Sequence, residues 1–307
     1  MQYIKQELLE FTSTNLTDTY PEWSSTTTYI VEPDTALTSA SVARYGAYYY
    51  RSVTNSNLNF NPNTYSDIKW VKYAVSNKYA MLDMSSNSKS IMEGGDLTVT
   101  FLQNQSSVIG IGNYEADYIT IEILAPNGVT VLWTYETPSN INANVYDYYE
   151  YIYAPYTIDQ DFTTKVNLPL QGRFVRLTFH KLLITDRAAC GYLIVGNPVD
   201  IGKSLMGVKF GYNSLTTKEI SSFGSLDIKK GFIQDIVDFE TVISSTYLPR
   251  MRRELKKIYD EIVLFIIDER DVSEYENLMT LGVIQDASVI LENDVESIIS
   301  FSILEAL

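Results

Sequence analysis

Cysteine and histidine are almost absent from this sequence, which contains one residue of each, Cys190 and His180. One cysteine cannot form a disulfide within the chain, and the pair cannot supply the ligands of a Cys/His zinc site, so we expect no metal. A thiol catalyst needs a cysteine and a histidine at hydrogen-bond distance. His180 shares the predicted polar face of a strand with Arg176 and Thr178, and Cys190 follows across a predicted turn. We therefore expect no catalytic residue here.

Positive charge is also scarce, since 23 Lys and Arg residues face 38 Asp and Glu residues and the net charge is −15. A nucleic-acid-binding surface needs a concentration of basic side chains, so direct nucleic-acid binding is not expected. No apolar run approaches the ~20 residues of a membrane span. Residues 1–7 lack the basic and apolar order of a secretory signal. We interpret the glycines at 94–95 and 110–112 as turn glycines; neither matches a phosphate-binding pattern, and no cofactor is expected.

Tyrosine, by contrast, is abundant, with 24 residues. Its flat ring with a polar tip suits recognition surfaces, but an A- and T-rich genome would produce the same bias, and both interpretations stay open. Tyr148 and Tyr151 lie next to Asp147 and Glu150 and would form a sugar platform. The competing interpretation is that these tyrosines pack along a sheet edge or at a subunit contact.

The chain is organised around residues 20–83, where Trp23 and Trp70 bracket short alternating segments. Residues 42–53 mix aromatic and polar side chains without a helical period, as in a half-buried strand, and the Asn-rich residues 55–63 are typical of a turn. So short a segment buries little apolar surface. We therefore expect both indoles to be mostly buried, with Tyr49 or Tyr50 packed between them.

These residues carry a resemblance to a known family. Their order resembles the small three-stranded carbohydrate-binding modules of the chitin- and cellulose-binding type. The residues concerned are Trp23, Tyr29, Tyr49, Tyr50, Arg51, Ser52, Asn55, Pro62 and Trp70. Residues 77–83, N-K-Y-A-M-L-D, are similar to an N-R-W-A-M-F-D segment that follows such a module in structural proteins of tailed phages. The family's Gly-Asp before the second strand is replaced by Glu32-Pro33-Asp34, and Thr54-Asn55-Ser56-Asn57 stand where sugar-binding members carry an exposed aromatic pair.

The resemblance implies a non-enzymatic virion protein of the tail, hub or baseplate, assembled in the host cytoplasm. Its implied partners are other virion proteins, further copies of itself in a ring or tail assembly, and a host-surface glycan. The candidate ligand-binding residues are the aromatic side chains Trp23, Tyr49, Tyr50, Trp70, Tyr148 and Tyr151. A free carbohydrate-binding protein is the alternative function. A glycan-cleaving enzyme, which would need two carboxylates about 5–10 Å apart, is the third.

The remainder of the chain is predicted to be mainly β, with four parts in all: a lead (1–19), the carbohydrate-binding-like module (20–83), a jelly-roll-type β-sandwich (84–212) and an α+β domain (213–307). Residues 96–103, 117–125 and 172–183 alternate like half-buried strands, and residues 126–128, Pro-Asn-Gly, predict a hairpin turn. The lead is expected to dock the module onto the next domain or onto a partner.

One helix is predicted after Pro249, because Met251, Leu255 and Ile258 recur at near-helical spacing. Basic residues cluster on the same segment, and Arg250, Arg253 and Lys257 are the candidate assembly interface. This cluster is either an ordinary solvated helix face or a docking face for an acidic patch on a neighbouring subunit. A nucleic-acid role ranks last, because the rest of the chain would repel phosphate.

Overall fold

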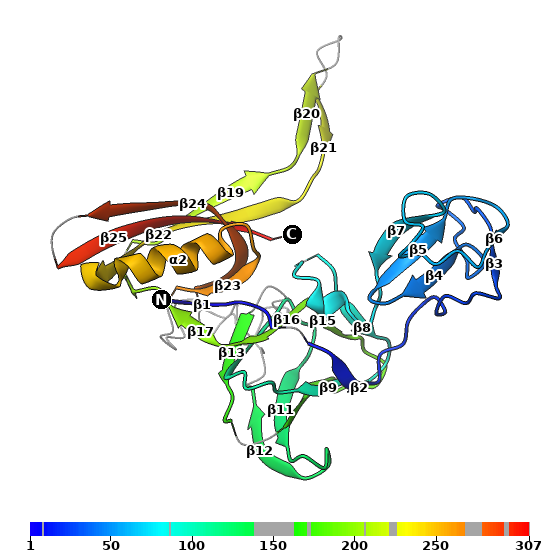
Figure 1. Ribbon diagram of the computed structural model, residues 1–307, viewed down its shortest axis with the longest axis horizontal. Helices are drawn as coiled ribbons and strands as arrows, with labels where there is room; N and C mark the ends of the chain where they lie inside the picture. Colours follow the sequence, from blue (N-terminus) through cyan, green and yellow to red (C-terminus); the bar gives the residue numbers. More distant parts are fainter. Residues whose placement is uncertain are drawn as a thin grey trace, which may run out of the picture.

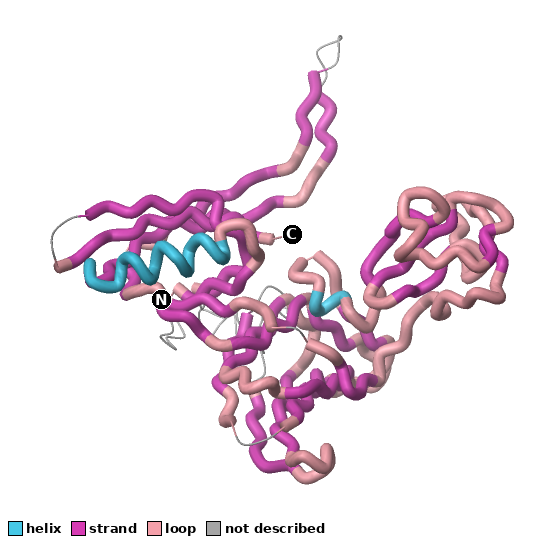
Figure 2. Tube along the Cα trace, viewed as in Figure 1, coloured by secondary structure: helices cyan, strands magenta, loops and turns pink. Residues whose placement is uncertain are grey.

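The computed structural model describes residues 1–7, 9–85, 87–137, 163–170, 173–205, 207–220, 226–267, 278–291 and 295–306. Over these residues the chain is mainly β, built from antiparallel sheets with one short α-helix, α2 (Leu248–Ile258), as Figures 1 and 2 show. The predicted fold class is confirmed at this level. Among the described residues, no helix is long and apolar enough to cross a lipid bilayer.

The module forms a small sheet and a two-stranded ribbon. The sheet has the order β4 (Val42–Tyr45), β5 (Tyr48–Ser52), β7 (Trp70–Val75). The ribbon pairs β3 (Thr28–Tyr29) with β6 (Asn57–Leu58), and the short 3₁₀ helix η1 (Ala80–Leu82) follows the module's last strand. Figure 1 shows this unit standing apart from the rest of the chain, to which it is joined through the lead and η1.

Two sheets face each other in the middle of the chain. The five-stranded sheet has the order β12 (Val131–Glu136), β11 (Tyr118–Leu124), β14 (Phe174–His180), β9 (Leu97–Leu102), β2 (Phe11–Thr14). The three-stranded sheet has the order β13 (Thr163–Asn167), β10 (Val108–Gly112), β16 (Tyr192–Gly196), and a ribbon of β8 (Ser90–Met92) and β15 (Ala188–Cys190) lies beside them. Alternating side chains of β9, β11 and β14 meet those of β10 and β16 in one core. The predicted sandwich of two packed sheets is therefore present, and its predicted hairpin turn closes between β11 and β12.

Strands β10 and β16 of the three-stranded sheet are buried on both faces. Every residue of β10 and β16 is buried, in contrast to the alternating burial of β9 and β14. One face of this sheet belongs to the sandwich core, and the other packs against the C-terminal sheet through Val108, Ile194 and Leu264. The turn assigned to residues 110–112 is wrong: both glycines lie inside β10. A Cβ on Gly110 would collide with Leu264, so the missing side chain allows the two layers to approach closely.

The C-terminal sheet has eight strands. Its order is β17 (Pro198–Asp200), β1 (Gln2–Ile4), β23 (Val263–Ile266), β24 (Met279–Leu291), β25 (Glu296–Glu305), β22 (Ile233–Ser244), β18 (Lys203–Ser204), with β19 (Lys209–Ser214) also paired to β22. The helix α2, preceded by the 3₁₀ turn η2 (Ser245–Tyr247), packs on one face of this sheet. The sequence predicts a polar loop or a short helix at 269–277, and this segment lies outside the described residues.

The boundary between the last two parts differs from the predicted one. Strands β17 and β18 fall inside the segment assigned to the sandwich, 84–212, and β19 begins inside it, but all three pair within the C-terminal sheet. The sandwich therefore ends with β16. Alternation in a sequence shows which side chains of a strand share a face, but it does not show which strand lies next to it. For this reason the sequence placed the end of the sandwich at residue 212, well after β16.

The lead connects three parts of the chain. Strand β1 is inserted between β17 and β23 of the C-terminal sheet, whereas β2 forms the edge of the five-stranded sheet. Asp18, at the end of the lead, forms an ion pair with Arg44 of the module at 3.0 Å. The predicted docking role of the lead is confirmed for the contacts within the chain.

A two-stranded arm extends from the C-terminal sheet. Beyond β19 and β22 the chain continues into the ribbon of β20 (Thr217–Ile220) and β21 (Leu226–Lys229). Figure 1 shows this ribbon projecting away from the sheet and from the sandwich.

Candidate functional site

The two most deeply buried aromatic rings of the module are Trp70 and Tyr29. Trp70 has no exposed surface, and its ring meets that of Tyr29 edge to face with centroids 4.8 Å apart. The indole Nε1 donates a hydrogen bond of 2.8 Å to the carbonyl oxygen of Phe60. The burial expected for Trp70 is confirmed, and in this position the ring has no face to offer a sugar.

Of the other predicted aromatic residues of the module, Trp23 and Tyr50 belong to this frame and Tyr49 does not. Trp23 and Tyr50 are half-buried and pack against the same cluster as Trp70. Tyr49 is buried: its hydroxyl accepts a hydrogen bond from the backbone N–H of Thr19 and donates one to Asp18, and burial raises its pKa. The structure thus packs Trp23, Tyr50 and Trp70 together as a frame, whereas Tyr49 packs separately, edge to face with Tyr20. Neither group forms an exposed platform. Tyr148 and Tyr151, with Asp147 and Glu150, lie outside the described residues.

Exposed aromatic surface on the module lies elsewhere, at positions that the sequence analysis did not single out. Tyr73 is 50% exposed on β7, and Tyr65 is 36% exposed. The Lys72 ammonium sits over the Tyr48 ring, 3.2 Å from its centroid. Tyr73 lies at a bulge in β7, between Lys72 and Ala74, which pair with Tyr50 and Tyr49. The sequence alone does not reveal this bulge, and so it could not show that Tyr73 faces solvent.

His180 lies on the outer face of the five-stranded sheet, as predicted from strand alternation. Its Nδ1 is 2.7 Å from Asp96 Oδ2, its Nε2 is 3.0 Å from Thr120 Oγ1, and its ring stacks on Tyr118. This Asp–His–Thr order is the hydrogen-bond order of a hydrolase triad. Here the three side chains stand on an open sheet face, and none of them lines a cavity found among the described residues.

Cys190 has no contact of the kind that a thiol catalyst needs. It is completely buried in the sandwich core, burial raises its pKa, and its Sγ lies 3.5 Å from the carbonyl oxygen of Tyr192. The hydrogen bonds of His180 go to other groups. Within the described part of the chain, no group of three His, Cys, Asp or Glu side chains is arranged to hold a metal ion.

We predict that neither residue matters for function. His180→Ala removes two partly exposed hydrogen bonds and should lower the free energy of unfolding by about 1–2 kcal/mol. Cys190→Ser places a hydroxyl near a carbonyl acceptor and should also fold. In the virion function that the resemblance of residues 20–83 implies, both variants should assemble and support infection at wild-type level, measured by particle yield and titre. Loss of infectivity in a folded, assembled variant would assign a role to the mutated residue.

The predicted helix is present and orients its apolar stripe as expected. Met251, Leu255 and Ile258 are buried against the C-terminal sheet, in one core with Phe239 and Phe301. This packing leaves the basic side chains of α2 exposed. They are Arg250, Arg252, Arg253, Lys256 and Lys257. We call this surface the basic face of α2.

The basic face is weakly neutralised by the chain itself. Among ion pairs between described residues, α2 forms only Lys257–Glu254, at 3.0 Å, which lowers the pKa of Glu254. The first turn of the helix has no acidic residue and no side-chain cap, and it carries Arg250. A cation at the positive end of a helix dipole is unfavourable, so Arg250 does not serve the stability of the helix, whereas Lys256 and Lys257 in the last turn are favourably placed.

The opposite face of the same sheet is acidic. Asp238, Glu240 and Asp286 are exposed and line a shallow groove of about 360 Å³ beside β19. The strand register aligns Asp238 and Asp286 on either side of Ser302. We call this surface the acidic face. It was missed in the sequence because its residues come from different strands, and only their pairing brings them together.

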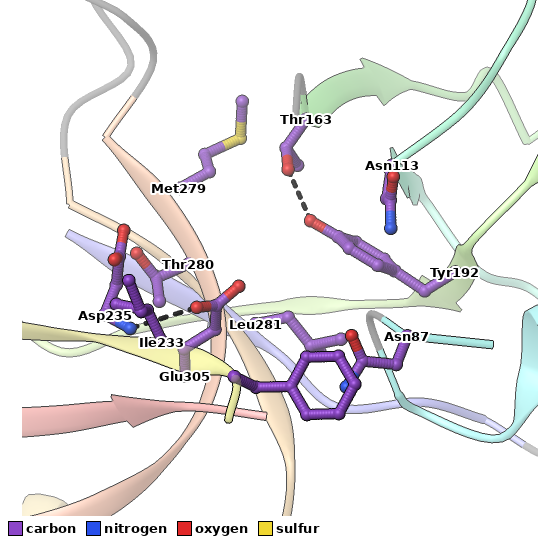
Figure 3. A pocket seen from close by; sticks show the side chains of 11 residues that line it. Asn87, Asn113, Thr163, Tyr192, Ile233, Asp235, Met279, Thr280, Leu281 and Glu305 are labelled. Atoms are coloured by element: carbon purple, nitrogen blue, oxygen red, sulfur yellow. Dashed lines mark hydrogen bonds between the residues drawn. The ribbon is translucent and has the colours of Figure 1, made fainter. Parts of the chain in front are cut away.

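A second cleft, of about 370 Å³, lies between the sandwich and the C-terminal sheet. Figure 3 shows Tyr192 and Thr163 on one side, joined by a hydrogen bond between their hydroxyl groups, and Glu305 accepting a hydrogen bond from the Asp235 backbone on the other. These polar groups have partners inside the chain, and we assign no ligand to the cleft.

Comparison of the chain with protein-family models, curated proteins and solved structures finds no match in any of the three.

Proposed function

We propose that the chain is a structural subunit of a tailed-phage virion, placed in the tail, hub or baseplate, that assembles through its C-terminal part. The observation that carries the assembly role is the projecting arm. A two-stranded ribbon alone is marginally stable in water and needs a covering layer. At the base of the arm, large apolar side chains are more than half exposed. They are Phe210, Tyr212, Phe232 and Ile233. Several exposed apolar side chains gathered at one end of a ribbon are typical of an interaction site.

The virion placement is supported by the resemblance of residues 20–83 to phage-associated modules. We further propose that this segment is a carbohydrate-binding-like module and that the two facing sheets form a jelly-roll-type sandwich. The three-stranded order β4–β5–β7 and the core of Tyr29 and Trp70 support the first proposal. The packing of a five-stranded on a three-stranded sheet supports the second.

Carbohydrate binding by the module is the alternative function. The exposed rings of Tyr65 and Tyr73 favour it, because an exposed aromatic face is what a sugar ring stacks on.

The virion proposal is tested with particles assembled in infected cells from an affinity-tagged chain. Mass spectrometry of purified particles should detect the chain. The double variant R253E/K257E should fold, since exposed charges change stability little, and should be lost from the particles. A matched control, K69E/K72E, makes the same charge change on the module and should be incorporated.

Each result has a separate meaning for the proposal. Absence of the wild-type chain from particles would remove the virion function. Normal incorporation of R253E/K257E would keep that function and move the anchor from α2 to the projecting arm, the lead or the sandwich.

A further inference from the structure

The C-terminal sheet carries opposite charge on its two sides. Along β22, Phe239 points into the core beneath α2, whereas the neighbouring residues Asp238 and Glu240 point to the other side. Because side chains alternate along a strand, the acidic face and the basic face of α2 are separated by the full thickness of the sheet. The two surfaces therefore cannot neutralise each other within one chain.

The basic side is strongly charged for such an acidic protein. The helix contains five basic residues and one acidic residue, a local net charge of +4, against −15 for the whole chain. Its Arg250, Arg252 and Lys256 form no ion pair with another described residue. Nucleic acid is not the favoured partner, because the rest of the chain would repel phosphate.

The acidic side presents three carboxylates close together. Asp238 and Asp286 lie two strands apart, which places them about 10 Å from each other, and Glu240 lies two residues along β22 from Asp238. None of the three forms an ion pair with a described residue, and Glu240 accepts only a weak hydrogen bond of 3.4 Å from Ser300. Lys209 of β19 lines the same groove and is the cross-strand partner of Asp238, so one cation faces three carboxylates. The carboxylates in excess repel one another, and a cationic partner would relieve that repulsion.

We propose that the acidic face of one copy of this chain receives the basic face of α2 from a second copy. The proposal deepens the assembly role proposed above and rests on it. Each copy carries one acidic face and one basic face of α2, so it can bind one further copy through each of them. The contact is heterologous, joining different surfaces of the two copies, and it repeats head to tail into a ring or a helical stack.

A second copy is the proposed partner because the basic face of α2 and the acidic face are opposite in charge. Two chains of net charge −15 repel at long range, so self-association needs a local contact of opposite sign. Such a contact sets the register between copies and weakens as salt rises.

The proposal is tested on the purified full-length chain with a zero-length carbodiimide cross-linker, which joins a lysine to a carboxylate only where they are in contact. A mixture of ¹⁵N-labelled and unlabelled protein at low ionic strength distinguishes links between copies from links within one. We expect mixed-isotope peptides joining Lys256 or Lys257 to Glu240 or Asp286, and their loss at high salt.

Charge reversal supplies the second arm of the test. The variants R253E/K257E and E240K/D286K should each lose the cross-link and the assembled species in size-exclusion chromatography with light scattering. Mixing the two should restore assembly, because each then offers the surface that the other needs. Circular dichroism checks that both variants are folded.

The outcomes separate this proposal from the virion function. A wild-type chain that is monomeric at low salt and gives no inter-copy link between these surfaces would overturn the second-copy contact, as would failure of the mixed variants to restore assembly. The chain could then still be found in particles, in which case α2 docks on a different virion protein. Absence from particles together with intact self-assembly would overturn the virion function alone.

Discussion

Replacing Trp70 with alanine is expected to lower the free energy of unfolding of the module by about 3–5 kcal/mol. The indole is completely buried and packs edge to face on Tyr29, so its removal leaves a cavity in a core of very few residues. The carbonyl oxygen of Phe60 also loses the hydrogen bond from Nε1. A small module has little other buried apolar surface to compensate for these losses.

Hydrogen exchange measured by mass spectrometry provides the test, because it resolves the module from the sandwich. Peptides covering β4, β5 and β7 should lose protection in Trp70→Ala, and those covering β9 and β14 should keep it. Tyr73→Ala is the matched control, since Tyr73 lies on the same strand and is half exposed, and it should change protection little. Unchanged exchange in the Trp70 variant would show that the aromatic frame does not hold the module together.

The sequence was sufficient to predict those helices and strands that have a strong local pattern of apolar residues. Met251, Leu255 and Ile258 specify both the helix and its buried side, because a period near 3.6 can place them on one face only. The short, apolar, glycine-bounded segment at 191–196 predicts a central strand; β16 does form there and is fully buried, but it is an edge strand of the three-stranded sheet, in which β10 is central. The glycines of β10 were misassigned because glycine is common in turns, and the close approach of Leu264 that requires Gly110 is invisible before the layers are assembled.

Of the two charged surfaces of the C-terminal sheet, only one could be predicted from the sequence. The basic face of α2 could be read directly, since its residues are close in sequence. The acidic face depends on the pairing of β22 with β25 and of β25 with β24, which brings Asp238 and Asp286 to either side of one serine. Long-range strand register of this kind is set by the tertiary structure, and no local pattern encodes it.

Replacing Ile4 with alanine is the second change for which we expect a large effect, about 2–4 kcal/mol. Ile4 has no exposed surface and lies with Ile194 and Leu264 in the core between the three-stranded sheet and the C-terminal sheet. The approach is close here, because a Cβ on Gly196 would collide with the backbone of Lys5. Ile4 therefore stabilises the contact between the three-stranded sheet and the C-terminal sheet more than it stabilises either sheet alone.

The opposite face of β1 strengthens this argument. Tyr3 packs in the core beneath α2 and lies 3.5 Å from Glu254, and burial together with that carboxylate raises its pKa to about 12. Strand β1 is thus bound on both faces and along both edges, to β17 and to β23. A cavity at Ile4 should loosen the coupling through which the sandwich and the C-terminal sheet unfold together.

Differential scanning calorimetry tests the coupling. In the wild-type chain the sandwich and the C-terminal sheet should unfold in one transition, and Ile4→Ala should shift that transition down and split it in two. The control is Lys5→Ala, the adjacent residue, whose exposed ion pair with Glu261 contributes little to stability. A single transition at the wild-type temperature in Ile4→Ala would mean that the two layers are held together by contacts other than β1.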